Sequence, residues 1–170
     1  MRLVKYILTF IIFLVIGFTL FMPKSNIYYK VEDILQKQGI VIDNEEIQDN
    51  LLDLKILHPV IYYQGLDVAR ASIITFRPML VLNTLKVEDI ELLGVAKNLN
   101  IDINRLSATH SILKPFYIKL NANGSFGLAK GYVDLKNRLI HIDIVEPKNI
   151  NPIRNFLKKG EKGWYYESNF

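Results

Sequence analysis

The chain has 170 residues, enough for one domain with its own core but short for two. Its 21 basic and 17 acidic residues give a net charge of +4, and no basic block is interleaved with aromatic residues, so nucleic acid is not an expected partner. Cysteine is absent, which excludes disulfides, thiolate nucleophiles and cysteine metal sites.

The first predicted element is an apolar segment near the amino terminus. Residues 6–22 contain no charge, whereas Arg2 and Lys5 precede them and Lys24 follows. As a helix this segment is about 26 Å long, close to the hydrocarbon thickness of a thin bilayer. We therefore expect a transmembrane helix over 6–23, with these representative anchor residues: Tyr6, Ile12, Gly17 and Met22.

A cleaved secretory signal peptide is the alternative interpretation of this segment, since it also has a basic start and an apolar middle. The apolar region is longer than in most signal peptides, and bulky Leu20, Phe21 and Met22 stand where a signal peptidase needs small side chains. The sequence favours a retained anchor. The charges before it place residues 1–5 in the cytoplasm and residues 24–170 outside it, as one β-rich domain that in a bacterium lies in the periplasm, attached to the inner membrane.

A short amphipathic helix is predicted near 26–38, directly after the apolar segment. Ser25 is a candidate N-cap, Ile27, Val31 and Ile34 share one face, and Gly39 has the position of a C′ residue. Such a helix covers one end of the domain's core or rests on the membrane surface. Both alternatives remain open.

From residue 40 onward, short alternating runs predict β-strands. The runs cover 40–42, 52–56, 60–63, 66–76, 85–93 and 99–103, with residues 80–82 completing a strand or leading into a turn at Asn83-Thr84. The acidic residues Glu45, Glu46, Asp49 and Asp53 indicate a solvated turn or short helix between the first two runs.

The last third of the sequence shows the clearest succession of strand and turn patterns. Strands are predicted at 116–120, 126–135 and 140–144, with turns at 121–124 and at Lys136-Asn137. The aromatic tail at 160–166 is interpreted as a closing edge strand or as a segment that docks on a partner or a bilayer. The predicted fold class is mainly β: a transmembrane helix, a short amphipathic helix, and a curved antiparallel meander.

Several strands carry apolar residues at both even and odd positions, as in 60–63 and 71–74. A sheet with one solvated face alternates more strictly. Either a second layer covers the other face, or that face forms an apolar groove. If a groove holds lipid, illustrative wall residues are Ile61, Tyr63, Ile74, Phe76, Phe116 and Ile118.

No catalytic or metal-binding motif accompanies this pattern. The three histidines, His58, His110 and His141, are scattered without metal-ligand spacing, and no nucleophile elbow, phosphate loop or dinucleotide fingerprint occurs. We expect a protein that is not an enzyme and has no cofactor, catalytic or metal site.

The order of parts resembles a known family. A short anchor and a helix lead into residues 66–80, followed by 84–92, and the glycine-punctuated segment 123–135 comes late. This arrangement is similar to the AsmA-like group, which includes the type II secretion system N protein. The resemblance covers most of 25–147 and implies a bacterial inner-membrane protein with a periplasmic β domain, associated with envelope assembly, phospholipid traffic or secretion.

Two functions follow as expectations. The first is a non-enzymatic, inner-membrane-anchored protein that scaffolds envelope assembly or secretion and binds partner proteins through the edges of its sheet. The second is a lipid-transfer module similar in layout to the lipopolysaccharide-export protein LptC, which would hold the acyl chains of phospholipid or lipopolysaccharide in an apolar groove. The expected partners are thus the bilayer, envelope or secretion proteins, and lipid.

Overall fold

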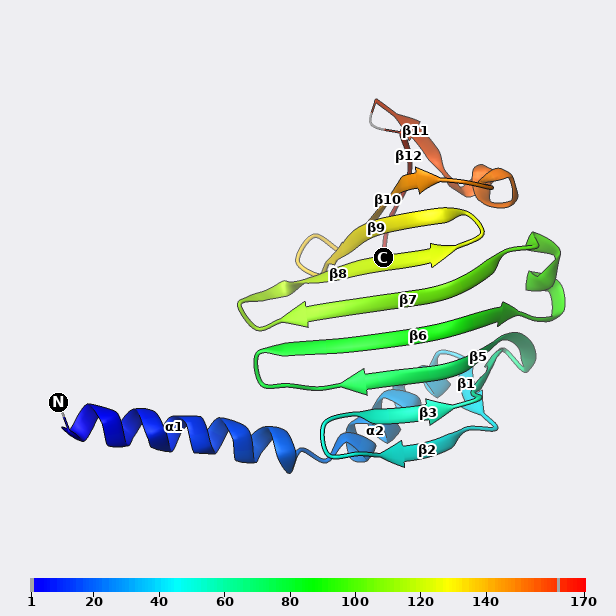
Figure 1. Cartoon of the computed structure of the whole chain (residues 1–170). Helices are drawn as coiled ribbons and strands as arrows, with labels where there is room; N and C mark the ends of the chain where they lie inside the picture. Colours follow the sequence, from blue (N-terminus) through cyan, green and yellow to red (C-terminus); the bar gives the residue numbers. More distant parts are fainter. Residues whose placement is uncertain (1, 162) are drawn as a thin grey trace.

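The computed structural model describes residues 2–161 and 163–170. Helix α1 (Arg2–Leu20) has no buried residue, and it is long and apolar enough to cross a membrane, a test that a signal sequence also passes. Figure 1 shows α1 projecting from one side of a broad sheet. Because the helix ends at Leu20, Met22 lies beyond it in the short connection to the next element.

Helix α2 (Lys24–Lys37) confirms the predicted amphipathic helix, with a start two residues earlier than expected. Its N-cap position is occupied by Pro23, so the prediction that Ser25 caps it is wrong. Ser25 instead lies inside the first turn, where its hydroxyl donates to a carboxylate oxygen of Asp49. Gly39 follows the helix with a φ of +80°, the left-handed conformation expected at C′.

The described residues form one open 12-stranded antiparallel sheet in which most neighbours are consecutive in sequence, which confirms the predicted meander (Figure 1). Short 3₁₀ helices η1 (Gly94–Leu99) and η2 (Asn151–Phe156) interrupt it. The strands are β1 (Ile40–Asp43), β2 (Glu46–Asp49), β3 (Leu54–Leu57), β4 (Val60–Tyr63), β5 (Leu66–Arg77), β6 (Leu82–Leu92), β7 (Asp102–Ser111), β8 (Lys114–Gly124), β9 (Gly127–Asp134), β10 (Leu139–Pro147), β11 (Lys158–Gly160) and β12 (Gly163–Asn169).

Three local predictions are wrong. Asn83 and Thr84 lie within β6 rather than in a turn, and residues 121–124 lie within β8, so that the turn falls at Ser125-Phe126. The acidic segment from Glu46 to Asp49 is strand β2. In each case pairing with a neighbouring strand outweighs the local turn preference of Asn, Asp and Gly.

A crease crosses the first strands of the sheet. Asn44, His58 and Asp89 have φ values of 60°, 52° and 51°, and they lie between β1 and β2, between β3 and β4, and within β6. The register of β1 with β4 continues unchanged in that of β2 with β3, so the two pairs together form one long hairpin that is bent at the crease. A left-handed residue in a strand rotates the chain and shifts which side chains point to each face.

At the crease, the positions that face the core change from even to odd or from odd to even. Ile42 and Ile47 pack against the same core cluster although they are five residues apart, a spacing that strict alternation would place on opposite faces. Likewise Val87 packs against the first core cluster and Leu92 against the second, on either side of Asp89. In β1–β2 and in β6, the core-facing positions therefore change phase at the crease.

Candidate functional site

One face of the sheet is apolar across most of its width. In one cross-strand row, residues paired from β3 to β10 are Ile56, Ile74, Val87, Leu106, Ala122, Ala129 and Ile144. In the next row they are Leu54, Phe76, Leu85, Ala108, Leu120, Gly131 and Ile142. Directly paired residues in antiparallel strands point to the same side, so these rows form a continuous apolar face.

The opposite face is polar. The row between those two, from β3 to β10, consists of Lys55, Thr75, Lys86, Ser107, Asn121, Lys130 and Asp143. A sheet with this division has one face suited to water and one face suited to apolar contacts.

Helix α2 covers the apolar face at the β1–β6 end. Tyr28 of the helix is buried with Leu54, Ile56 and Ile74. Its hydroxyl lies 3.1 Å from Oε1 of Glu45 and donates to it. Burial, together with the charge of Glu45, raises the pKa of Tyr28 well above its ordinary value, so the phenol stays neutral.

A cavity of about 230 Å³ remains between α2 and the sheet. All its lining residues are apolar apart from the hydroxyl of Tyr28: Ile27, Tyr28, Val31, Leu35, Ile42, Ile56, Ile74, Phe76 and Leu85. Its volume lies below the roughly 300–1,000 Å³ of pockets that enclose a whole ligand, so it is a recess for the end of an apolar chain rather than a site for a whole lipid.

Helix η2 and the segments beside it cover the other end of the apolar face. Ile101, Phe126, Ala129 and Ile144 form a buried cluster, against which Ile150 and Ile153, before and within η2, are packed. Between this cluster and α2, side chains of β6 to β9 remain half-buried or exposed: Leu85, Leu106, Leu120 and Val133. We call this set the open strip.

The structure brings two of the predicted groove residues together. Ile74 and Phe76 both line the cavity under α2. Ile61 pairs with Ile42 beyond the crease, on the same face but outside that cavity, and Tyr63 is 48% exposed at the end of β4. The predicted wall residues are therefore spread over separate parts of the sheet.

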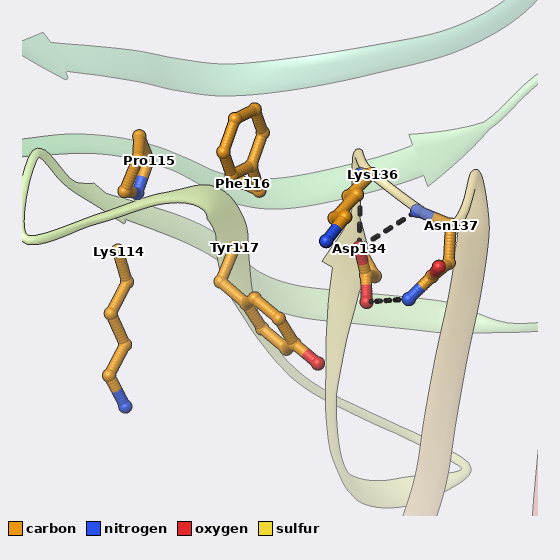
Figure 2. A pocket seen from close by; sticks show the side chains of 7 residues that line it. All are labelled: Lys114, Pro115, Phe116, Tyr117, Asp134, Lys136 and Asn137. Carbon is orange, nitrogen blue, oxygen red and sulfur yellow. Dashed lines mark hydrogen bonds between the residues drawn. The ribbon is translucent and has the colours of Figure 1, made fainter.

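Phe116 and Ile118 lie farther along, on β8. Ile118 pairs with Val133 beside the open strip. Phe116 is exposed and lines a shallow hollow with Lys114, Tyr117 and Lys136, as Figure 2 shows. Ile118 thus lies next to the open strip and Phe116 lies in the shallow hollow, and neither residue lines the recess under α2.

Sequence reasoning missed the central members of the strip, Leu85, Leu106 and Leu120, as possible contact residues. For Leu106, the signal is the alternation of residues 105–109, where Leu106 and Ala108 stand between Arg105, Ser107 and Thr109. It was not recognised because no strand was predicted there, although β7 extends to Ser111.

On the polar face, aromatic rings stack across neighbouring strands. The ring of His141 lies 5.6 Å from that of Tyr132 and 5.4 Å from that of Tyr165, and its nitrogens lie 3.0 Å from Glu167 and 3.2 Å from Asp143. Among the described residues, no group of three or more His, Asp or Glu side chains could hold a metal ion. The His141 contacts tie β9, β10 and β12 together.

The last turns of α1 lie beside the β5–β6 connection. Val15, Ile16, Thr19 and Leu20 line one shallow apolar hollow together with Leu52 and residues 79–82. The predicted anchor residues Tyr6 and Ile12 are exposed on α1, and Gly17 has no atom of another segment within 4 Å of its added Cβ. The free part of α1 is thus its first two-thirds.

Comparison with protein-family models, curated proteins and solved structures finds no match for this chain.

Proposed function

We propose that the chain is a single-pass membrane protein whose sheet acts outside the cytoplasm as a non-enzymatic scaffold in envelope assembly or secretion. The supporting observation is that an apolar helix without buried residues is joined by only residues 21–23 to α2, which packs on the open sheet. The basic residues Arg2 and Lys5 lie in the first turns of the helix, before its uncharged stretch, which favours a cytoplasmic amino terminus and, in a bacterium, an inner-membrane location.

The outer half of β12 has one side free for a partner strand. Its residues 165–169 pair with β10 on one side, whereas β11 pairs only with residues 163–165 on the other. The remaining described backbone of β12 can accept an added strand. By contrast β11 carries Lys158 and Lys159, charges that discourage edge pairing.

Photo-crosslinking in intact cells tests this proposal. A photoreactive amino acid at Ser168, on the free half of β12, is expected to form an adduct with a strand of another envelope protein, mapped by mass spectrometry. The matched control is the same amino acid at Thr109, in the central strand β7. Equal labelling at both positions, or none at Ser168, would contradict partner binding through this edge.

Binding of acyl chains is a second candidate, favoured by the open strip and the recess under α2. The strip is apolar and leads from β9 to the cavity, whose lining includes Leu85. A methylene chain of phospholipid or lipopolysaccharide placed on it would bury apolar surface, at about 0.8 kcal/mol per methylene group.

Two neighbouring positions on β8 separate this candidate from non-specific adsorption. Leu120 belongs to the strip, whereas Lys119 lies on the polar face. Leu120→Asn is expected to abolish co-purification of lipid, measured by extraction and mass spectrometry, while Lys119→Asn retains it. Equal lipid content in both variants and the parent chain would exclude the strip as the binding surface.

A further inference from the structure

The hairpin connections on the α1 side of the sheet form a common edge. Strand β2 leads into β3 through residues 50–53, β5 into β6 through 78–81, β7 into β8 through 112–113, and β9 into β10 through 135–138. Antiparallel order places all four connections at the same end of their strands, and Figure 1 shows that α1 projects from this side. We call these four connections the tip edge.

The tip edge exposes large apolar side chains. One residue in each connection illustrates this, with the fraction of its surface exposed: Leu51 63%, Val81 47%, Leu113 80% and Leu135 42%. Hairpin connections in water normally carry polar or glycine residues, because their side chains have no core to enter. An apolar residue repeated at four neighbouring connections indicates a shared apolar surface beyond them.

Basic and aromatic side chains accompany these residues. Lys114 and Lys136 border a hollow of about 460 Å³ with Phe116 and Tyr117, as Figure 2 shows, and Arg138 follows in the same connection as Lys136. The carboxylate of Asp134 in this hollow accepts hydrogen bonds from the backbone N–H groups of Lys136 and Asn137 and from the side-chain amide of Asn137. Lysine and arginine beside aromatic and aliphatic side chains are typical of surfaces that contact anionic lipid headgroups.

The position of α1 indicates which surface the tip edge contacts. Its last turns, from Val15 to Leu20, line one hollow with residues 79–81 of the tip edge and with Leu82, the first residue of β6. From Val15 to Leu20 the helix rises by about 8 Å along its axis. If α1 spans the bilayer, this connection therefore reaches the boundary between headgroups and acyl chains, the depth at which interfacial elements bind.

We infer that the tip edge docks on the bilayer that holds α1, with the exposed apolar residues at the headgroup boundary and the basic residues among anionic phospholipid headgroups. This inference rests on the proposed function, since it requires α1 to be a membrane anchor. The strands then stand upright on the membrane, and the connections at 64–65, 93–101 and 125–126 lie at the far end of the sheet.

Depth-dependent fluorescence quenching of the full chain in phospholipid vesicles tests the inference. Because the chain has no cysteine, single substitutions Leu113→Cys and Leu135→Cys introduce unique labelling sites. Val95→Cys is the matched control, since Val95 is 79% exposed, close to the 80% of Leu113, but lies at the far end of the sheet. The vesicles contain phosphatidylethanolamine and phosphatidylglycerol, with nitroxide quenchers attached to the headgroup or to shallow or deep acyl positions.

Labels at positions 113 and 135 are expected to be quenched by headgroup and shallow nitroxides, and the label at 95 to show only background quenching. Removing phosphatidylglycerol, or the double change Lys136→Gln and Arg138→Gln, should lower the quenching at 113 and 135. Background quenching at both positions would overturn the inference. Protection from aqueous iodide without quenching by lipid would also overturn it, since a protein would then cover the tip edge.

A label at Ile12→Cys separates the two proposals. Strong quenching at position 12 by deep nitroxides, with none at positions 113 and 135, contradicts docking of the tip edge but supports α1 as a membrane anchor. Absence of deep quenching at position 12 contradicts the anchor itself and the inference with it.

Discussion

The ammonium nitrogen of Lys24 lies 3.1 Å from Oδ1 of Asp49, so the first residue of α2 forms an ion pair with the last residue of β2. The Lys24 side chain is only 5% exposed, and it also donates to the carbonyl oxygen of Met22 at 3.3 Å. This pair fixes the start of α2, and with it the end of α1, against the sheet.

Removing the charge of Asp49 leaves a buried ammonium group without its counter-ion. We expect Asp49→Asn to lower the free energy of unfolding by about 1–3 kcal/mol, the cost of an unsatisfied buried polar group. Urea unfolding of the detergent-solubilised chain, followed by circular dichroism, measures this change. Asp33→Asn is the control, because its partner Lys37 is exposed and such a pair contributes less than about 1 kcal/mol. Equal losses in the two variants would contradict a special role for Lys24.

Asp134 is expected to make stability depend on pH in the acid range. The N–H of Asn137 is the main cause that lowers the pKa of Asp134, and the Asn137 side chain and the N–H of Lys136 also donate to the carboxylate. Since the folded pKa lies below that of the unfolded chain, about 3.9, the stabilisation is complete above that value and is lost as pH falls through the folded pKa.

The comparison of Asp134→Ala with the parent chain measures this effect. The difference between their urea midpoints should be constant near pH 6–7 and should shrink below about pH 4. Asp134→Asn, which keeps an acceptor oxygen without a titrating group, serves as the control. A difference that does not vary between pH 6 and pH 3 would show that the carboxylate charge does not stabilise the turn.

The left-handed conformation at Asp89 predicts an unusual tolerance of glycine within a strand. Asp89 has a φ of 51° and is exposed. Asp89→Gly is expected to keep or raise the thermal midpoint, because glycine adopts this conformation without steric cost. Asp89→Val should lower the free energy of unfolding by about 1–2 kcal/mol. The same change at Lys86, an exposed β6 residue with ordinary φ, should have little effect, and a similar loss there would refute the explanation.

Gly131 occupies a crowded position in the second apolar row. A Cβ at this residue would come within 2.2 Å of the His141 carbonyl oxygen and 2.8 Å of the Ile142 Cα atom. We expect Gly131→Ala to lower the free energy of unfolding by about 1–3 kcal/mol, as overpacking does. Gly17→Ala in α1 is the control, with nothing within 4 Å. Unchanged thermal unfolding of Gly131→Ala would show that β9 and β10 can separate freely here.

Sequence patterns predict an element correctly where the local conformational preference of its residues agrees with their packing in the fold. The expected strands at 60–63 and 66–76 lie within one residue of β4 and β5, because these runs are rich in β-branched and aromatic residues and also contribute core residues such as Val60 and Ile74. Residues 121–124 were assigned to a turn because Asn and Gly favour turns. In the sheet the backbone of these residues pairs with both β7 and β9, and those pairings hold residues 121–124 in strand β8 instead of a turn.

The candidate site was harder to predict than the strands. Strict alternation at 116–120 allowed Ile118 to be proposed, but the phase changes at Asn44, His58 and Asp89 depend on backbone conformations that these residue types adopt only in context. The recess under α2 likewise depends on how the helix lies across Ile74 and Phe76. Periodicity alone shows neither feature.

The short connection between α1 and α2 also limits how far the protein can reach. Residues 21–23 are too few to form a flexible linker. The ion pair of Lys24 with Asp49 restricts rotation of the sheet relative to α1. The longest strand, β5, has 12 residues and extends about 40 Å at 3.3 Å per residue. If α1 is inserted in a bilayer, any partner or cargo of the sheet must come within that distance of the bilayer surface. It must also approach from the side of α1 on which the sheet is held.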